Sequence, residues 1–328
     1  MKRVFPLAIA LVLLLAAGCG KSPARGAAQA IETSIVSAEE DAAQSGTEDA
    51  THSSLYLVDG ESDESDSGVY ASDEAYENAV LVQNAGVLVM TSADINKIGD
   101  ASGDASGGQN AAIAVLGGSE MTLEQSNVTT NATGGIGLYV SGAGSVMTIL
   151  DSAIYTAGEA SPALVVTDGA LASMRGGTLA TEGGDAPCIL LSGGSALLYG
   201  VKLSTAGEAQ LHVLSGENAL TLDQTAVQTD PVFAEECSLL LRLQNGASFT
   251  GALGGSLPAK ASLWLDASST LALNAETYLA VFVNADAAHA NIQSNGFNLY
   301  YDSNAPENAY LGGQSFMLPG GGFLAPII

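Results

Sequence analysis

The amino-acid sequence predicts an all-β protein, a single-stranded right-handed parallel β-helix (β-solenoid) of about 8–10 coils. Three observations predict it. Threonines recur at steps of 26, 25, 24 and 24 residues, in the column Thr130, Thr156, Thr181, Thr205 and Thr229. Each of them stands two places after a branched apolar residue, and a glycine-containing turn precedes each repeat. Short runs of alternating apolar residues fill the intervals, as the strands of stacked coils require.

The chain begins with a targeting segment. Lys2 and Arg3 precede the apolar stretch 5–15, and small residues then lead to Cys19. This pattern resembles a bacterial lipobox, in which residues 1–18 are a lipoprotein signal peptide and Cys19 is lipidated. We therefore expect an extracytoplasmic protein, anchored through an N-terminal lipid to the bacterial membrane or cell surface. An ordinary secretory signal, cleaved near Ala17, is the alternative.

Residues 19–52 are expected to form an acidic, disordered tether. They are rich in small and acidic residues and contain little that a core could bury. Fourteen acids lie between Glu32 and Glu77, and no Lys or Arg falls in that span. Self-repulsion would extend such a segment and hold the folded part away from the membrane.

The overall charge excludes one class of partner. The chain has 9 basic and 35 acidic residues, which gives a formal net charge of −26. Nucleic acid would repel it, because phosphate binding needs clustered Lys and Arg. Acidic polysaccharides are also disfavoured unless divalent cations bridge the two. We therefore expect the membrane and a glycan or surface-protein ligand as partners. We also expect the chain to be a monomer.

The parallel β-helix and its caps are expected over residues 53–302. Each coil offers two or three short strands whose alternate residues point into a narrow apolar bore. The expected inward residues of the six coils are Val80, Val82, Leu88, Met90 and Ile95; Ile113, Val115, Met121, Leu123 and Val128; Leu138, Val140, Met147, Ile149 and Ile154; Leu164, Val166, Ala172, Met174 and Leu179; Ile189, Leu191, Leu197, Tyr199 and Leu203; and Leu211, Val213, Leu220, Leu222 and Val227. The threonine column is expected to close one corner of each coil through hydrogen bonds. An ice-binding lattice is disfavoured, since the neighbouring outward residues form no regular array.

The two ends of the coil stack need caps, because a terminal coil otherwise exposes its bore and its strand edges. Residues 54–58 and 68–70 are candidates at the N-terminal end. Residues 278–283 and 296–301 carry denser aromatics and are expected to close the other end. The remaining residues, 303–328, are expected to form a loosely packed tail.

An insertion rich in Gly, Asp and Ser lengthens the first repeat at residues 99–108. Asp100 and Asp104 are weak candidates for a Ca²⁺ site, and a plain flexible loop is the alternative. No other cofactor is expected. Cys188 and Cys237 lie about two repeats apart, so about 10 Å separates them and both are expected to be free thiols.

The order of these elements resembles a set of secreted and surface-located bacterial β-helix proteins, described as adhesin-like, with a pectate-lyase-like fold. Residues 77–82, 93–97, 108–112 and 294–300 carry the resemblance, which covers about residues 53–302. It implies the fold and a surface location. It carries over no catalytic residue.

The outward positions of the first strand in successive coils form a candidate binding face. They are largely uncharged and include Tyr139, Val165, Leu190 and His212. An exposed apolar stripe of this kind would be a docking face for a partner or a glycan, with Tyr139 as an aromatic platform. The alternative is that a loop or the end of the chain covers it.

These observations predict a non-catalytic adhesion or glycan-binding scaffold, with a passive spacer as a further alternative. A polysaccharide lyase or hydrolase on the same fold is the main alternative function. It would need a cation cluster with a basic residue, or paired carboxylates. The coil region has five basic residues, expected in different coils and on different faces: Lys97, Arg175, Lys202, Arg242 and Lys260.

Overall fold

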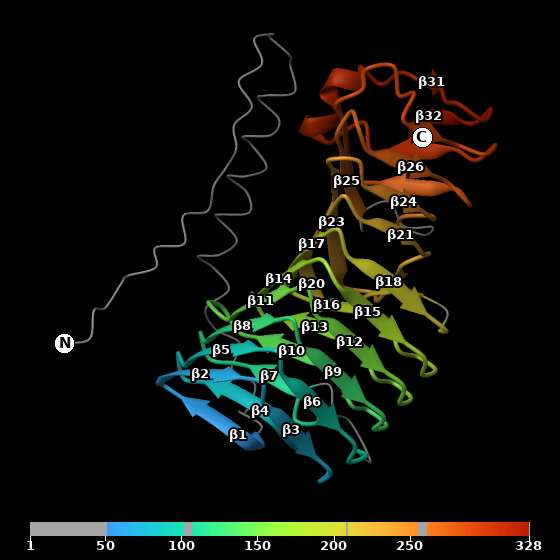
Figure 1. Cartoon of the computed structure of the whole chain (residues 1–328). Coiled ribbons are helices and arrows are strands. Elements are labelled where there is room, and N and C mark those ends of the chain that lie inside the picture. The colour runs from blue at the N-terminus through green and yellow to red at the C-terminus, as the bar shows by residue number, and fades with distance from the viewer. Residues whose placement is uncertain (1–50, 102–106, 208, 255–260, 328) are drawn as a thin grey trace.

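The computed structural model describes residues 51–101, 107–207, 209–254 and 261–327. This part of the chain is a right-handed parallel β-solenoid of about 11 turns with 2% helix. Its coils stack in one direction, from the N-terminal strands to the C-terminal elements (Figure 1). The fold class predicted from the sequence is therefore confirmed. The expected 8–10 coils are too few, because residues 53–72 form a complete coil and not only a cap.

Three parallel sheets form the sides of the first part of the solenoid, and each coil contributes one strand to each sheet. The first sheet contains β1 (Ser53–Asp59), β4 (Glu77–Gln83), β7 (Ile113–Val115), β10 (Leu138–Ser141), β13 (Leu164–Thr167), β16 (Ile189–Ser192), β19 (Leu211–Val213) and β22 (Val232–Phe233). The third contains β3 (Val69–Ser72), β6 (Asp94–Lys97), β9 (Asn127–Thr130), β12 (Ala153–Thr156), β15 (Thr178–Thr181) and β18 (Lys202–Thr205).

The second sheet is the longest and continues through both halves of the stack. It contains β2 (Ser62–Asp66), β5 (Val87–Thr91), β8 (Glu120–Glu124), β11 (Val146–Leu150), β14 (Leu171–Arg175), β17 (Ser195–Tyr199), β20 (Gly216–Asp223), β23 (Cys237–Gln244), β25 (Ala261–Leu265) and β28 (Val281–Asn284). Towards the C-terminus two shorter sheets flank it. They contain β21 (Ala226–Gln228), β24 (Ser248–Thr250), β26 (Thr270–Ala272) and β29 (Ile292–Gln293), and then β27 (Thr277–Leu279), β30 (Leu299–Tyr301), β32 (Phe323–Pro326) and β31 (Phe316–Met317).

The apolar core follows the solenoid axis, as the periodicity predicts. The expectation for Leu197 and Tyr199 is wrong: on β17 the inward residues are Ala196 and Leu198, in register with the buried Ala172 and Met174. Val128, Ile154, Leu179 and Leu203 stand in one file, in register from strand to strand. The second sheet adds inward files such as Leu88 and its successors, all almost completely buried. Each coil thus buries its apolar side chains against the coils on either side, and this burial is the main stabilising contribution.

The threonine column closes one corner, as predicted. Thr130, Thr156, Thr181 and Thr205 are in register on the third sheet. The Oγ1 of Thr156 donates to the carbonyl oxygen of Ser161 at 2.5 Å, and that of Thr181 donates to Ala186 at 2.6 Å. These bonds satisfy turn carbonyls inside a buried corner, where an unpaired group would be costly.

The C-terminal residues do not form a loosely packed tail, and that expectation is wrong for residues 303–327. Residues Pro306–Leu311 form the 3₁₀ helix η1, and β31 pairs with β32 in a hairpin beside β30. Leu311, Leu318 and Leu324 are at most 2% exposed and belong to the main core. The last coil needs a cover for its bore, and these residues provide it.

Cys188 is buried and carries a free thiol, as the two-coil separation from Cys237 predicts. Burial raises the pKa of the Cys188 thiol to about 11, so it stays protonated. None of the helical segments in the described part of the chain is long and apolar enough to cross a bilayer.

Candidate binding face

The face predicted from the sequence is assembled as expected but is not exposed over most of its length. Tyr139, Val165, Leu190 and His212 stand in one file on the outward side of the first sheet. Tyr139 is 5% exposed and Val165 is 2% exposed. They form a second buried cluster together with Leu81, Ala111, Ala114 and Ile136. The prediction of an exposed apolar stripe centred on Tyr139 is therefore wrong, and the alternative, that a loop covers this face, is confirmed.

The cover includes the C-terminal part of the first-repeat insertion. A Cβ placed on Gly108 would lie 2.2 Å from Cδ1 of Tyr139, so the backbone of Gly108 lies directly against the ring. The Nδ2 of Asn78 donates to the carbonyl oxygens of Gly108 and Ala111, at 2.8 and 2.9 Å. These bonds hold the segment over the first sheet.

The proposed Ca²⁺ ligands are not brought together by any described contact. The Oδ1 of Asp100 accepts a hydrogen bond from the backbone N–H of Thr133 at 2.7 Å, and Asp104 lies outside the described residues. Within those residues no group of three or more His, Cys, Asp or Glu side chains is arranged to hold a metal. Calcium binding stays a prediction.

Leu190 and His212 continue the file beyond the cover and are half-buried. Burial lowers the pKa of His212, and the charge of Asp185 partly opposes this effect. These two residues alone offer a narrow strip, so the first sheet gives little accessible surface for a ligand.

The outward side of the second sheet carries a different set of side chains, which we call the Arg–aromatic face. It consists of Arg175, Tyr199, Asp223, Arg242, Gln244 and Trp264. Arg175, Tyr199, Asp223 and Gln244 form one file across four successive strands. Arg242 and Trp264 are in register in the neighbouring file. The two arginines were expected on different faces, and that expectation is wrong.

Each arginine on this face lies over an aromatic ring. The Cζ of Arg175 is 5.2 Å from the centroid of Tyr199, and that of Arg242 is 4.9 Å from the centroid of Trp264. Trp264 is the single tryptophan of the chain. Arg175 is exposed, and the other three side chains are half-buried. Such stacking fixes the orientation of the guanidinium groups.

Asp223 and Trp264 each have a side-chain polar atom without a hydrogen-bond partner among the described residues. Asp223 is 8% exposed, and its Oδ2 accepts hydrogen bonds from Gln244 at 2.9 Å and Asn245 at 2.8 Å. Its Oδ1 and the Nε1 of Trp264 have no hydrogen-bond partner among the described residues. Both atoms are buried, and buried polar groups without partners are rare in folded proteins.

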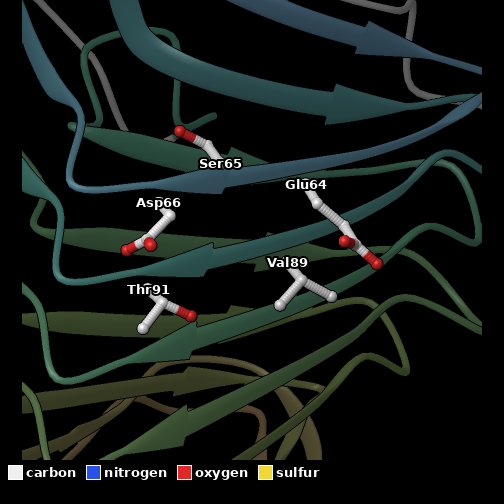
Figure 2. Close-up of a pocket in the computed structure, with 5 residues that line it drawn as sticks. All are labelled: Glu64, Ser65, Asp66, Val89 and Thr91. Carbon is white, nitrogen blue, oxygen red and sulfur yellow. The ribbon is translucent and has the colours of Figure 1, made fainter.

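The same side of the second sheet is acidic and hollowed at its N-terminal end. A depression of about 340 Å³ is lined by Glu64, Ser65, Asp66, Val89 and Thr91. Figure 2 shows Glu64 and Asp66 on β2 beside Val89 and Thr91 of the adjacent β5. The charge on this side therefore changes from negative at β2 to a mixture with two guanidinium groups at β14–β25.

Comparison with known proteins adds no assignment: no known family model matches the chain, and neither does any curated protein.

The sequence does not predict the Arg–aromatic face as a site, although its alternation indicates which way the arginines point. The alternation that turns Ala172 and Met174 inward turns Arg175 outward, and the same rule applies to Arg242 between Leu241 and Leu243. The scarcity of Arg and Trp in the chain was a second signal. What the sequence did not give is the strand register that places each ring beside its guanidinium group.

Proposed function

We propose that this protein is a lipid-anchored, extracytoplasmic scaffold that binds a saccharide on its Arg–aromatic face without chemistry of its own. One observation carries the proposal: two arginine–aromatic pairs lie on the outward side of one rigid sheet. The adhesin-like resemblance and the predicted lipidation of Cys19 support the location.

The residue types match what a sugar presents. Pyranose rings have apolar faces that pack on aromatic side chains, and their hydroxyl groups both donate and accept hydrogen bonds. Tyr199 and Trp264 supply the rings, and the exposed guanidinium group of Arg175 supplies donors. Because parallel coils hold these groups in place, binding orders few side chains, which lowers its entropic cost.

The charge balance favours a neutral saccharide. The chain carries a net charge of −26, and Asp223 stands on the face itself. A polyanion would meet repulsion over most of the surface, and like charges at an interface act against a wrong partner. The exposed guanidinium group of Arg175 can donate to sugar hydroxyls as well as to anions.

The alternative function is a polysaccharide-active enzyme. Hydrolysis of a glycosidic bond ordinarily uses two carboxyl groups that flank the bond. The six residues of the Arg–aromatic face include a single carboxylate, Asp223, which already accepts two hydrogen bonds. This composition suits retention of a saccharide better than its cleavage.

The test is incubation of the purified protein with neutral and acidic polysaccharides, with and without Ca²⁺. We expect retention of a neutral polysaccharide and no released product. The double variant Arg242→Ala/Trp264→Ala should weaken retention at least about tenfold, since aromatic and arginine contacts dominate binding energies. Tyr155→Ala is the matched control, because Tyr155 is a half-buried tyrosine on the outward side of the third sheet.

Release of shortened products would establish the enzyme instead. Absence of both retention and cleavage across the panel would leave a passive spacer and end the proposal.

A further inference from the structure

The outward side of the second sheet carries accessible apolar side chains on the strands nearest the N-terminal end. Six aliphatic residues of β5, β11, β14 and β17 point outward there: Val87, Val89, Val146, Leu150, Leu171 and Leu197. Leu171 is 42% exposed, Leu197 37% and Val87 36%, and the other three are half-buried. Exposed apolar surface that continues from strand to strand marks an interaction site.

Four carboxylates divide this surface along the solenoid axis. Glu64 and Asp66 lie on β2, and Glu120 and Glu124 lie on β8. The order along the sheet is therefore acidic on β2, apolar on β5, acidic on β8, and apolar on β11, β14 and β17. Within the part of the chain that the structure describes, none of the four carboxylates forms an ion pair. We call the six aliphatic and four acidic residues the acidic–apolar face.

The acidic pair on β2 borders a concave part of this face. Glu64 and Asp66 line the depression of about 340 Å³ together with the aliphatic side chain of Val89 (Figure 2). A lysine or arginine side chain has an apolar stem and a cationic tip, so it matches this combination of groups.

The spacing of the strands matches the repeat of an amphipathic α-helix. The strands β2, β5, β8, β11, β14 and β17 are successive neighbours, about 4.8 Å apart, and span about 24 Å. Helix residues i, i+3, i+7, i+10, i+14 and i+17 share one side of the helix and span about 25 Å at a rise of about 1.5 Å per residue. A helix that lies along the solenoid axis therefore presents one such residue to each strand.

We propose that the acidic–apolar face docks a cationic, amphipathic helix of another protein along the solenoid axis. Basic residues at i and i+7 of that helix pair with the carboxylates of β2 and β8. Apolar residues at i+3, i+10, i+14 and i+17 pack on β5, β11, β14 and β17. This inference goes beyond the proposed function, since it concerns a second ligand and mainly other residues of the same sheet.

Charge selects this occupant over two others. A second copy of the chain would bring its own net charge of −26 and the same four acids to the contact. Residues 32–50 contain acids and no Lys or Arg, so this segment of the chain itself is equally ill suited. Like charges at an interface disfavour both, whereas a basic helix is attracted to the face.

The experiment is calorimetric titration of the purified protein with a synthetic helical peptide of about 18 residues. The peptide carries Lys at its first and eighth positions, Leu at the four apolar positions of the pattern, and Ala and Gln elsewhere. We expect one peptide to bind per protein. The double variants Glu120→Gln/Glu124→Gln and Leu171→Ser/Leu197→Ser should each weaken binding at least about tenfold, since each removes one of the two kinds of contact.

Two double variants on other surfaces are the matched controls. Glu235→Gln/Glu236→Gln removes two exposed acids, and Leu55→Ser/Leu57→Ser removes two leucines of β1 that are 58% and 47% exposed. Both should bind the peptide as the wild-type protein does, and circular dichroism checks that every variant is folded. A peptide of the same composition with shuffled Lys and Leu positions should bind at least about tenfold more weakly.

Three results would overturn the proposal. Equal weakening by Glu120→Gln/Glu124→Gln and by the control Glu235→Gln/Glu236→Gln would show that net charge alone attracts the peptide. Absence of binding, or equal binding of the shuffled peptide, would show that the face does not recognise the helical pattern. A wild-type dimer in sedimentation that Leu171→Ser/Leu197→Ser dissociates would identify a second copy as the occupant.

Discussion

At the scale of single residues, the corners of the coils depend on individual polar side chains. Thr181 donates to Ala186 and lies 2.8 Å from the hydroxyl of Thr205 one coil further on. One coil before Thr130, in the same column, Lys97 replaces a threonine, is completely buried, and donates through Nζ to the carbonyl oxygen of Glu74 at 2.5 Å. The longer side chain of Lys97 thus reaches a carbonyl of the preceding coil, whereas Thr156 and Thr181 bond to carbonyls five residues further along the chain.

His289 is a second residue whose setting the sequence did not reveal. It is 4% exposed and lies between Phe282 and Phe316, with ring centroids 5.8 and 5.3 Å from its own. Burial lowers the pKa of His289, and the charge of Asp286 partly opposes the shift. Because Phe316 belongs to the C-terminal hairpin, the neutral imidazole is part of the C-terminal cap.

This setting predicts a pH dependence of stability. The pKa of His289 is lower in the folded protein than in the unfolded chain, where it is about 6.5, so the unfolded chain takes up the proton first. The free energy of unfolding should therefore fall as the pH drops through about 6.5. Denaturant unfolding between about pH 7.5 and 5 measures it.

His289→Asn should reduce this slope, since Asn tolerates the positive φ of 53° at this position. His212 has the same direction of pKa shift, so His212→Asn should remove a further part of the slope. A slope that both substitutions leave unchanged would contradict the assignment.

At the scale of structural elements, the first coil differs from the coils that it covers. Where later coils place apolar residues in the bore, β2 places Asp63 and Ser65 in register with Leu88 and Met90. Tyr56 donates to Asp63 at 2.5 Å, Tyr70 hydrogen-bonds Ser65, and the two tyrosine rings are 5.0 Å apart. An inward-pointing charge is a known device that stops the exposed edge of a sheet from pairing with another molecule.

Replacing this polar end with apolar residues should therefore cause self-association. In the double variant Asp63→Leu/Ser65→Val the bore reaches the end of the solenoid as an apolar surface beside open strand edges. We expect the wild-type protein to sediment as a monomer and the double variant to form dimers or larger assemblies at micromolar concentration. Asp63→Asn, which keeps a polar group, should stay monomeric. A monomeric double variant would show that other features protect this end.

At the scale of the whole molecule, the periodic part of the chain was predictable and the aperiodic part was not. The files of inward residues, such as Val128 and Ile154, follow from alternation and a constant repeat length. The C-terminal cap and the cover over Tyr139 depend on segments that occur once, so no repeat indicates where they pack. The pairing of Arg242 with Trp264 needs the register between two coils of unequal turn length.

This division explains why the candidate site lies on the second sheet and not on the first, where the sequence predicts it. The outward apolar file on the first sheet was correctly predicted, but Gly108 and the residues around it cover Tyr139. The second sheet runs through ten strands, and its outward side holds both arginine–aromatic pairs. A solenoid supplies several equivalent faces, and the segments inserted between its coils decide which of them can meet a ligand.

The central claim is that a saccharide binds across Trp264, and the protein carries its own reporter because this is its single tryptophan. The most direct measurement is the intrinsic tryptophan fluorescence during titration with the neutral polysaccharide that the protein retains. We expect a saturable change in emission whose midpoint agrees with the affinity measured independently. In Arg242→Lys the midpoint should shift to a higher polysaccharide concentration. Tight binding with no change in tryptophan emission would contradict the account.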